Sequence, residues 1–367
     1  MVLFRIVGGT MPEWGLQERG VQHSWLWDKY CFPLRRAATG KFAKFASSRA
    51  YVGVCPILAA MSARMTVIQT EHLSPQAATW LAERADLVVG DAESAAFAAA
   101  APRAAALVVR TYTQVNDALL ARLPALRAVG RAGVGLDNID LDACARRGVR
   151  VFNTPDANTQ AVVEYVTCLV CDALRPRLFL DAPVSKARWN EIREEVVAHR
   201  QMNELRMGIL GFGRVGRRVA DVARAIGFDV VFHDVLNIPE SERRGARSVS
   251  AAELFATSDV VTVHIDGRSS NRGFVNAALI NAMKPDALFI NTSRGFVVDH
   301  VALAGHLRAC PGAQAILDVH EPEPIDARNP LLGIPNAHLA PHLASRTDAA
   351  MDAMSWVVRD VWDAIAP

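Results

Sequence analysis

The sequence predicts an α/β protein built from two doubly wound parallel sheets. Short apolar segments alternate with helical segments of roughly 8–15 residues, an order typical of β-α-β units and of parallel sheets. This alternation occurs twice, first from about residue 65 and again from about residue 207. A length of 367 residues also exceeds what one ordinary domain holds. We therefore expect two domains, each with its own sheet.

The composition is that of a globular protein. Hydrophobic residues make up 51% and charged residues 21%, which excludes a wholly disordered chain. The formal net charge of +2 lacks the basic excess of a dedicated nucleic-acid binder. Uncharged apolar runs stay below about 18 residues, so we expect no membrane-spanning helix and no membrane partner. The six cysteines are few for this length, which favours reduced thiols and a cytoplasmic location.

Residues 1–64 differ from the rest of the chain. Residues 1–50 carry eight Lys or Arg against three Asp or Glu, and neither helical nor strand periodicity persists there. A secretory signal pattern is not recognisable, although Arg35–Ala50 is compatible with a transit peptide. We expect residues 1–64 to be a poorly ordered, non-functional extension, with the real start at Met61 or Met65.

The first α/β module begins directly after this extension. Ser74 is expected to cap a helix that has Pro75 at its first position and runs to about Arg84. An Ala-rich helix lies between the second and third strands. The expected strands are Thr66–Gln69, Asp86–Val89, Ala105–Val109 and Leu126–Gly130, and a further helix is expected at Asn116–Leu123.

Helices connect the modules and close the chain. Helical patterns at Thr159–Arg175 and Ala187–Gln201 precede the second module, and Asp348–Ile365 reads as one final helix. Cys168 and Cys171 form a C-x-x-C pair inside the apolar connecting helix. Because no second ligand pair lies beside them, we expect them to pack in a core rather than to bind metal or exchange electrons.

Gly211, Gly213 and Gly216 form a G-x-G-x-x-G motif between an apolar strand and a helix. The next strand, Val230–His233, ends at Asp234, which completes the context of a Rossmann dinucleotide-binding unit. The glycines allow a tight turn, close approach of the backbone to the pyrophosphate, and close helix–strand packing. Amide groups at the helix start then hold the phosphates. Asp234 would bond the ribose hydroxyls and repel a 2′-phosphate, which predicts NAD rather than NADP.

The position of this motif predicts an inserted domain. Roughly 145 residues of α/β sequence separate Met65 from the first glycine, so another lobe must come first. We expect the final helix to return to that lobe. The predicted substrate domain comprises residues 65–160 and 338–367, and the predicted nucleotide domain comprises residues 161–337 with the connecting helices.

Several sequence blocks together identify a family. They are Gly130–Asp140, the glycine motif, Ile290–Gly295, and Asp318–Pro324 with Pro341–His342. With them, the chain from about Met65 to its end resembles the D-isomer-specific 2-hydroxyacid dehydrogenases, and among these the short phosphoglycerate dehydrogenases without a regulatory domain. The resemblance implies a Rossmann NAD-binding domain inserted into a flavodoxin-like substrate domain. It also implies a homodimer or homotetramer.

The family's catalytic Arg, Glu and His fall on Arg294, Glu323 and His342. Oxidation of a 2-hydroxy acid requires removal of the hydroxyl proton while a hydride leaves C2, and a histidine suits this proton step because its pKa lies near neutrality. A carboxylate on the far ring nitrogen would orient the imidazole, as in hydrolase triads. An arginine offers a planar fork for the substrate carboxylate and the developing alkoxide.

Other positions are expected to contact the cofactor or the substrate. Backbone N–H groups of Val134 and Gly135 can face the substrate carboxylate. Arg110 matches an arginine of the family that contacts phosphoglycerate, with a plain surface charge as its alternative. Asp318 resembles the family's contact to the nicotinamide carboxamide, with a turn cap as its alternative. The expected cofactor-binding residues are Gly211, Gly213, Arg214, Val215, Gly216, Asp234, Ile265, Thr292, Ser293 and Asp318.

Neighbouring residues compete for the catalytic roles. His320 and His338 are alternatives to His342 as the base, and Glu321 is an alternative to Glu323. His264, at the end of a strand, is expected to pack beside the cofactor rather than to take part in the chemistry.

The sequence departs from the family pattern in four places. Leu343–Ser345 replaces the usual Gly-Gly after the histidine, and His320 stands where an aromatic residue is usual. Asp266–Arg272 lacks the usual Pro-Leu-Thr start, and Tyr112 stands where some phosphoglycerate enzymes have a second arginine. These departures bear on the shape of the pocket and on the recognition of a phosphate.

The expected function is NAD-dependent hydride transfer at C2 of a D-2-hydroxy acid, with 3-phosphoglycerate and phosphohydroxypyruvate in serine biosynthesis as the leading pair. One alternative is reduction of hydroxypyruvate or glyoxylate with the same machinery. An alternative from another class is an NAD-sensing scaffold, because transcriptional corepressors resemble this fold. Neither a metal nor a nucleic-acid partner is expected.

Overall fold

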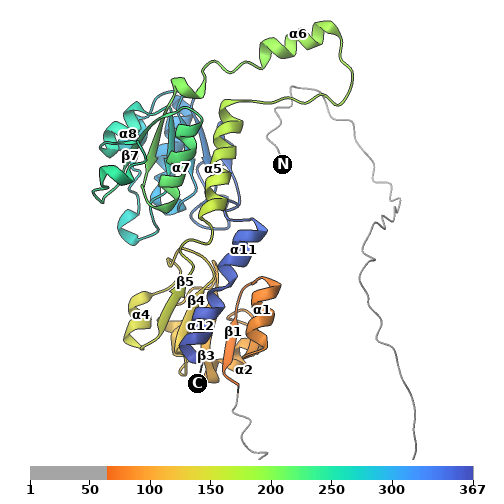
Figure 1. Ribbon diagram of the computed structural model, residues 1–367, viewed down its shortest axis with the longest axis vertical. Coiled ribbons are helices and arrows are strands. Elements are labelled where there is room, and N and C mark those ends of the chain that lie inside the picture. The colour runs from red at the N-terminus through yellow and green to blue at the C-terminus, as the bar shows by residue number, and fades with distance from the viewer. Residues whose placement is uncertain (1–63, 367) are drawn as a thin grey trace, which may run out of the picture. The chain divides into compact units, whose positions relative to one another are not determined.

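The computed structural model describes residues 64–366, which fold around two parallel β-sheets (Figure 1). The predicted α/β class with two parallel-sheet modules is therefore confirmed. The expectations about residues 1–63, including a start at Met61, lie outside the described residues. Across residues 64–366, no helix is both long and apolar enough to cross a membrane.

The first sheet has five strands in the order β2-β1-β3-β4-β5, all paired in parallel. Strand order 2-1-3-4-5 is that of flavodoxin-like sheets, whose crossover helices cover both faces. The strands are β1 (Thr66–Gln69), β2 (Asp86–Val89), β3 (Ala104–Val109), β4 (Ala128–Arg131) and β5 (Arg150–Asn153). The helices that join them are α1 (Pro75–Ala82), α2 (Ala95–Ala100), α3 (Asp117–Ala121) and α4 (Leu141–Arg146).

Capping side chains set the starts of these helices. Ser74 accepts a hydrogen bond from the N–H of Ala77, and Pro75 occupies the first position of α1, as predicted. Asn116 and Asp140 cap α3 and α4 in the same way. Successive residues of β1, β3 and β4 are all buried and point to opposite faces of the sheet, where they fill two separate apolar clusters, as a doubly wound sheet requires.

The second sheet has seven parallel strands in the order β12-β11-β10-β9-β6-β7-β8. Its first strand along the chain, β6 (Arg206–Leu210), leads through the glycine turn into α7 (Arg214–Ala225), as in a Rossmann fold. The other strands are β7 (Asp229–His233), β8 (Arg247–Ser248), β9 (Val260–Val263), β10 (Leu288–Asn291), β11 (Gln314–Leu317) and β12 (Ala337–Leu339). The remaining helices of this module are α8 (Ala251–Thr257), α9 (Ala277–Ala282) and α10 (His300–Ala309).

The last helix returns to the first sheet, as the insertion predicts. Helix α12 (Val357–Ile365) packs against β3, β4 and β5. Gly130 leaves room for it, because a Cβ there would lie 2.4 Å from a Cγ of Val361. We still propose the predicted division into two domains. The expected boundary between residues 337 and 338 falls inside β12, which pairs with β11 of the second sheet. We therefore place the end of the nucleotide domain after β12.

Three local expectations were wrong. The polar connecting helix, α6 (Lys186–Glu195), ends six residues before Gln201, because Val196 leaves the helical conformation with φ −98° and ψ 69°. The final helix is two helices, α11 (Asp348–Ser355) and α12, divided at Trp356. Cys168 is exposed and Cys171 is half-buried, so this pair does not pack in the core. The buried valines of α5 (Thr159–Leu174) occupy the opposite face of that helix.

Two glycines of the second module should respond oppositely to alanine. Gly305 lies exposed inside α10, and a Cβ there would meet no atom within 4 Å, so Gly305→Ala should stabilise the full chain by about 0.5–1 kcal/mol. Gly211 has φ +94°, and a Cβ there would lie 2.7 Å from the backbone of His264 and Ile265. Gly211→Ala should therefore destabilise the chain by about 1–3 kcal/mol. Urea unfolding midpoints measure both changes, and a wild-type midpoint for Gly211→Ala would contradict this account.

Candidate functional site

The site lies where the parallel strands of the second sheet end, beside the loop that follows β4 of the first. Open α/β sheets bind ligands at the carboxyl ends of their strands. A cavity of about 720 Å³ is lined there by residues from both modules. A second cavity of about 560 Å³ adjoins it, and the two share Val134, Asn158, Val215, His264 and Ile265.

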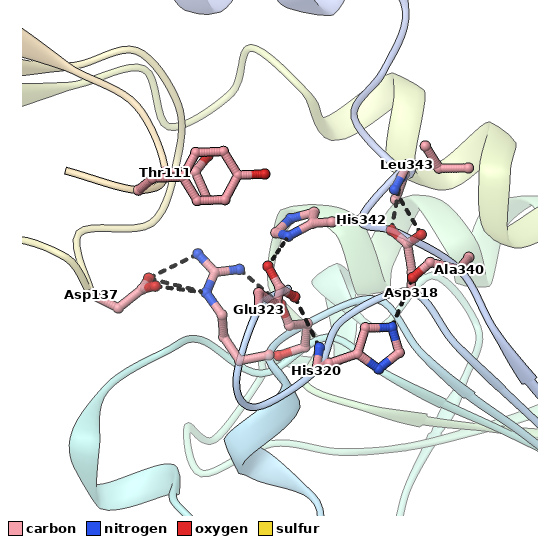
Figure 2. Close-up of polar contacts among 12 residues, drawn as sticks. Thr111, Asp137, Asp318, His320, Glu323, Ala340, His342 and Leu343 are labelled. Carbon is pink, nitrogen blue, oxygen red and sulfur yellow. Dashed lines mark hydrogen bonds and ion pairs between the residues drawn. The ribbon is translucent and has the colours of Figure 1, made fainter. Parts of the chain in front are cut away.

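His342, at the edge of the larger cavity, forms a hydrogen bond with Glu323. The Nδ1 atom of His342 lies 2.8 Å from Oε2 of Glu323, and Figure 2 shows the ring turned toward this carboxylate. Burial alone would raise the pKa of Glu323, but the bond to His342 and the attraction to it lower that pKa below its usual value. The carboxylate therefore stays ionised at neutral pH. With Nδ1 engaged, the Nε2 atom of His342 is left as the nitrogen for a substrate proton.

Asp318 holds the loop that carries His342. Its two carboxylate oxygens accept hydrogen bonds from the N–H groups of Leu343 and Ala344, at 2.7 and 2.8 Å (Figure 2). Its backbone oxygen accepts from the N–H of His342, whose φ of +55° is unusual for a residue with a side chain. Asp318 is fully buried. These bonds agree with the turn-cap alternative for Asp318, and its contact to the nicotinamide carboxamide stays a prediction.

Arg294 follows β10 and joins the two modules. Its guanidinium donates to both carboxylate oxygens of Asp137, with Nε at 3.0 Å from each and Nη2 at 2.8 Å from Oδ1. A Cβ at Gly135 would lie 1.8 Å from Nη2 of Arg294, so a side chain there would displace the guanidinium from its present position. Burial opposes the charge of Asp137, but the bonds from Arg294 outweigh this effect and lower its pKa.

The loop after β4 offers backbone donors to the same cavity. Val134 and Gly135 line it, and within residues 64–366 their N–H groups donate no hydrogen bond. Free N–H groups in a turn form a concave site for an oxyanion. The predicted positions Arg294, His342, Val134 and Gly135 therefore face one space.

The smaller cavity follows the glycine turn. A Cβ at Gly216 would lie 2.1 Å from the carbonyl oxygen of Gly211, so α7 can pack this closely only with glycine there. At Gly213 a Cβ would meet nothing within 4 Å, which leaves open space directly at the start of the twelve-residue α7. Gly213, Arg214 and Val215 line this cavity. A pyrophosphate fits such a turn, because the first N–H groups of the helix point at it.

Other expected cofactor residues surround this turn. Asp234, at the end of β7, accepts from the N–H groups of Phe212 and Leu236 at 2.6 and 2.8 Å, and it lines the cavity together with Ile265. Thr292 and Ser293 instead line the larger cavity. The hydroxyl of Ser293 donates to the carbonyl oxygen of Ile265, so it supports that residue.

Arg110 also lines the larger cavity. The carboxylate of Glu71 accepts hydrogen bonds from four consecutive N–H groups, those of residues 110–113, and so fixes this loop. The guanidinium of Arg110 itself bonds the carbonyl oxygen of His72 and the sulfur of Met351. Tyr112, the departure noted in the sequence, also lines this cavity and is 69% exposed.

The competing candidates have other partners. Glu321 pairs with Arg272 at 2.7 and 2.8 Å, away from His342. His320 is buried, and its Nε2 atom bonds the carbonyl oxygen of Ala340 at 2.8 Å (Figure 2). Enclosure by protein lowers the pKa of His264 to about 3, so it stays neutral between the two cavities. His338 lies within β12 and lines neither cavity.

Comparison with known proteins gives the family. Residues 167–344 match the model of the D-isomer specific 2-hydroxyacid dehydrogenase NAD binding domain. The chain is 37% identical to (S)-sulfolactate dehydrogenase of Chromohalobacter salexigens over 260 residues, which cover 70% of this chain and 82% of that protein. The chain belongs to the D-isomer-specific 2-hydroxyacid dehydrogenase family.

Two further relatives extend this comparison. D-3-phosphoglycerate dehydrogenase of Archaeoglobus fulgidus is 33% identical over 71% of this chain, but the match spans about half of that protein, 49% of its length. A solved glyoxylate reductase from Paecilomyes thermophila is 26% identical with a TM-score of 0.69, covering 83% of this chain and 96% of that one. Membership makes this chain an NAD-dependent oxidoreductase of the D-2-hydroxyacid dehydrogenase class, a class that acts on small 2-hydroxy or 2-oxo acids.

Sequence reasoning missed two residues of this dehydrogenase site. One is Asp137, the carboxylate partner of Arg294, which was missed although the sequence block that contains it also supplied Val134 and Gly135. Arg131 in that block also lines the cavity. The available signal for both was a charged residue two positions from a glycine in the turn that follows a buried strand.

Glu323 and Glu321 form a matched pair for testing the site. Glu323→Gln removes the charge that faces the His342 ring, so turnover of a 2-oxo acid with NADH should fall about 100-fold. Glu321→Gln removes only an exposed pair with Arg272, so turnover should stay within about twofold of wild type. Steady-state kinetics at saturating NADH measure both variants. An equal fall in turnover in the two variants would show that Glu323 has no specific role in supporting His342.

Proposed function

We propose that the chain exchanges a hydride between NAD and C2 of a D-2-hydroxy acid, with 3-phosphoglycerate and phosphohydroxypyruvate as the leading substrate pair. The observation that supports this reaction type is that His342, hydrogen-bonded to Glu323, and Arg294 line one cavity, which adjoins the cavity at the glycine turn.

His342 is the proposed acid and base. In the oxidative direction its Nε2 atom takes the proton of the C2 hydroxyl, and in the reductive direction the imidazolium returns that proton to the oxygen. Glu323 stabilises the charged ring and fixes the tautomer with a proton on Nδ1. Asp318 acts one step further away, because it fixes the backbone of the loop that carries the imidazole.

Arg294 and the N–H groups of Val134 and Gly135 are the proposed sites for the C1 carboxylate. A guanidinium held by Asp137 is already oriented, so little freedom is lost when substrate binds. The same cation favours the negative charge that develops on the C2 oxygen.

The nucleotide residues proposed for NAD are Gly211, Gly213, Arg214, Val215, Gly216, Asp234 and Ile265, with Thr292 and Ser293 nearer the substrate. When bound, NAD supplies the hydride acceptor, and NADH supplies the donor. The carboxylate of Asp234 suits ribose hydroxyls and repels a 2′-phosphate, which supports NAD over NADP. Enclosed His264 is neutral and adds no charge at the junction of the cavities.

The substrate assignment is supported by Arg110 and by the names of the relatives. Sulfolactate and 3-phosphoglycerate are both three-carbon 2-hydroxy acids with a second anionic group, and Arg110 supplies a cation inside the cavity. A role in serine biosynthesis in the cytoplasm follows from this assignment. The second candidate is hydroxypyruvate or glyoxylate reduction, which the likeness to a glyoxylate reductase favours.

We also propose that the chain forms a homodimer or homotetramer. Helix α6 has no buried residue, and Figure 1 shows it standing apart from α5 and α7. The segment around it exposes Phe179 by 70% and Trp189 by 50%. Sedimentation velocity of the full chain measures the assembly, and a monomer at micromolar concentration would contradict this proposal.

The direct test is NADH oxidation by a panel of 2-oxo acids together with His342→Ala. We expect turnover of at least one acid, and a fall in kcat of about 100-fold or more in His342→Ala, with NADH affinity unchanged because the ring lies outside the glycine cavity. Fluorescence titration of NADH provides the binding control. Tight NADH binding without turnover on any acid would instead support the scaffold, and normal turnover in His342→Ala would remove His342 from its role.

A further inference from the structure

The loops that carry Arg294, Glu323 and His342 meet at one residue, His320. These loops follow β10, β11 and β12, which are neighbouring strands of the second sheet. His320 is buried, with 6% of its surface exposed, and it lines neither of the two cavities. Any effect of His320 on the reaction therefore has to act through these loops.

The backbone of His320 contacts two of the three loops. Its N–H group donates to Oε1 of Glu323 at 2.9 Å, while Oε2 of the same carboxylate lies 2.8 Å from Nδ1 of His342. A Cβ at Gly295, the residue after Arg294, would lie 2.1 Å from the carbonyl carbon of His320 and 2.3 Å from its oxygen. These backbone contacts do not require a particular side chain at position 320.

The side chain of His320 reaches the third loop. Its Nε2 atom lies 2.8 Å from the carbonyl oxygen of Ala340, two residues before His342 (Figure 2). Because a carbonyl oxygen only accepts, Nε2 carries the proton. Within residues 64–366, the oxygen of Ala340 accepts from no backbone N–H, and Nδ1 of His320 has no partner. This bond therefore links the ring to the segment that leads into His342.

The segment before His342 needs such a link because Pro341 interrupts its backbone bonds. The N–H groups of Ala340 and His342 donate to carbonyl oxygens at the end of β11, at 2.8 Å each, but proline between them has no N–H. His342 itself has a φ of +55°, a conformation that a residue with a side chain keeps only when its surroundings hold it. The ring of His320 thus holds the chain directly before this unusual conformation.

We propose that the imidazole of His320 is a positioning group for His342. Its hydrogen bond to Ala340 fixes the segment that carries the proton-transferring ring relative to Glu323. The proposal rests on the proposed function, in which His342 is the acid and base. His320 stands where an aromatic residue is usual in the family, so this hydrogen bond comes from a departure of this chain from the family pattern.

Two amide variants separate the hydrogen bond from the rest of the side chain. The amide nitrogen of glutamine can lie near the place of Nε2, whereas that of asparagine lies near Nδ1 and falls short of Ala340. We expect His320→Asn to lower kcat with NADH and the best 2-oxo acid about tenfold, with KM within about twofold of wild type, because misplacing the acid slows chemistry more than binding. His320→Gln should retain at least about half of the wild-type kcat.

A double-mutant cycle with Glu323→Gln tests whether His320 acts through the pair of His342 and Glu323. In the Glu323→Gln background the pair is already broken, so adding His320→Asn should lower kcat by less than about a further twofold. A purely structural role of His320 would instead give the same tenfold fall in both backgrounds.

His306→Asn is the matched control. His306 is also a buried histidine, with an unpartnered Nε2, but it lies in α10 and lines neither cavity. Its variant should keep kcat within about twofold of wild type even if its urea midpoint falls. If His320→Asn does not fold, His320→Phe replaces it, because phenylalanine keeps a ring and lacks the donor. The same tenfold fall is expected, and NADH titration confirms that each variant is folded.

The possible failures are distinguishable. Wild-type kcat in the variants without the donor, equal falls in His320→Asn and His320→Gln, or equal falls in both backgrounds of the cycle would overturn the positioning role and leave the proposed reaction intact. Absence of NADH oxidation by the wild-type chain with every acid would overturn the proposed function itself, and the positioning role with it.

Discussion

The hydrogen bond between His342 and Glu323 is the interaction on which the site depends. The two side chains come from separate loops, after β12 and after β11, and they meet because parallel strands end at one edge of the sheet. Asp318 fixes the histidine loop through backbone N–H groups. The sheet thus places an ionised carboxylate against one ring nitrogen and leaves the other nitrogen free for substrate.

Positive charge is the second organising feature of the site. Arg294 is neutralised by Asp137 from the other module, which makes it a fixed and oriented donor. Arg110, Arg131 and Arg346 line the same cavity as Arg294.

The sequence was informative where local patterns determine local structure. The glycine turn, the cap at Ser74 and the pairing of Glu323 rather than Glu321 followed from spacing and from the resemblance. The partner of Arg294 did not, because Asp137 lies 157 residues away and the contact exists only after both modules fold. The helix break at Trp356 depends on tertiary packing, because α11 packs against α1 whereas α12 packs against the sheet. The exposure of Cys168 also depends on tertiary packing, because the buried face of α5 is the one opposite Cys168.

A crystal structure of the full chain with NADH and oxamate would test the central assignment most directly. We predict that the oxamate carbonyl oxygen lies within hydrogen-bond distance of Nε2 of His342. We also predict that the oxamate carboxylate contacts Arg294 and the N–H groups of Val134 and Gly135. Oxamate bound elsewhere, or an imidazole turned away from it, would contradict the role of His342 in proton transfer.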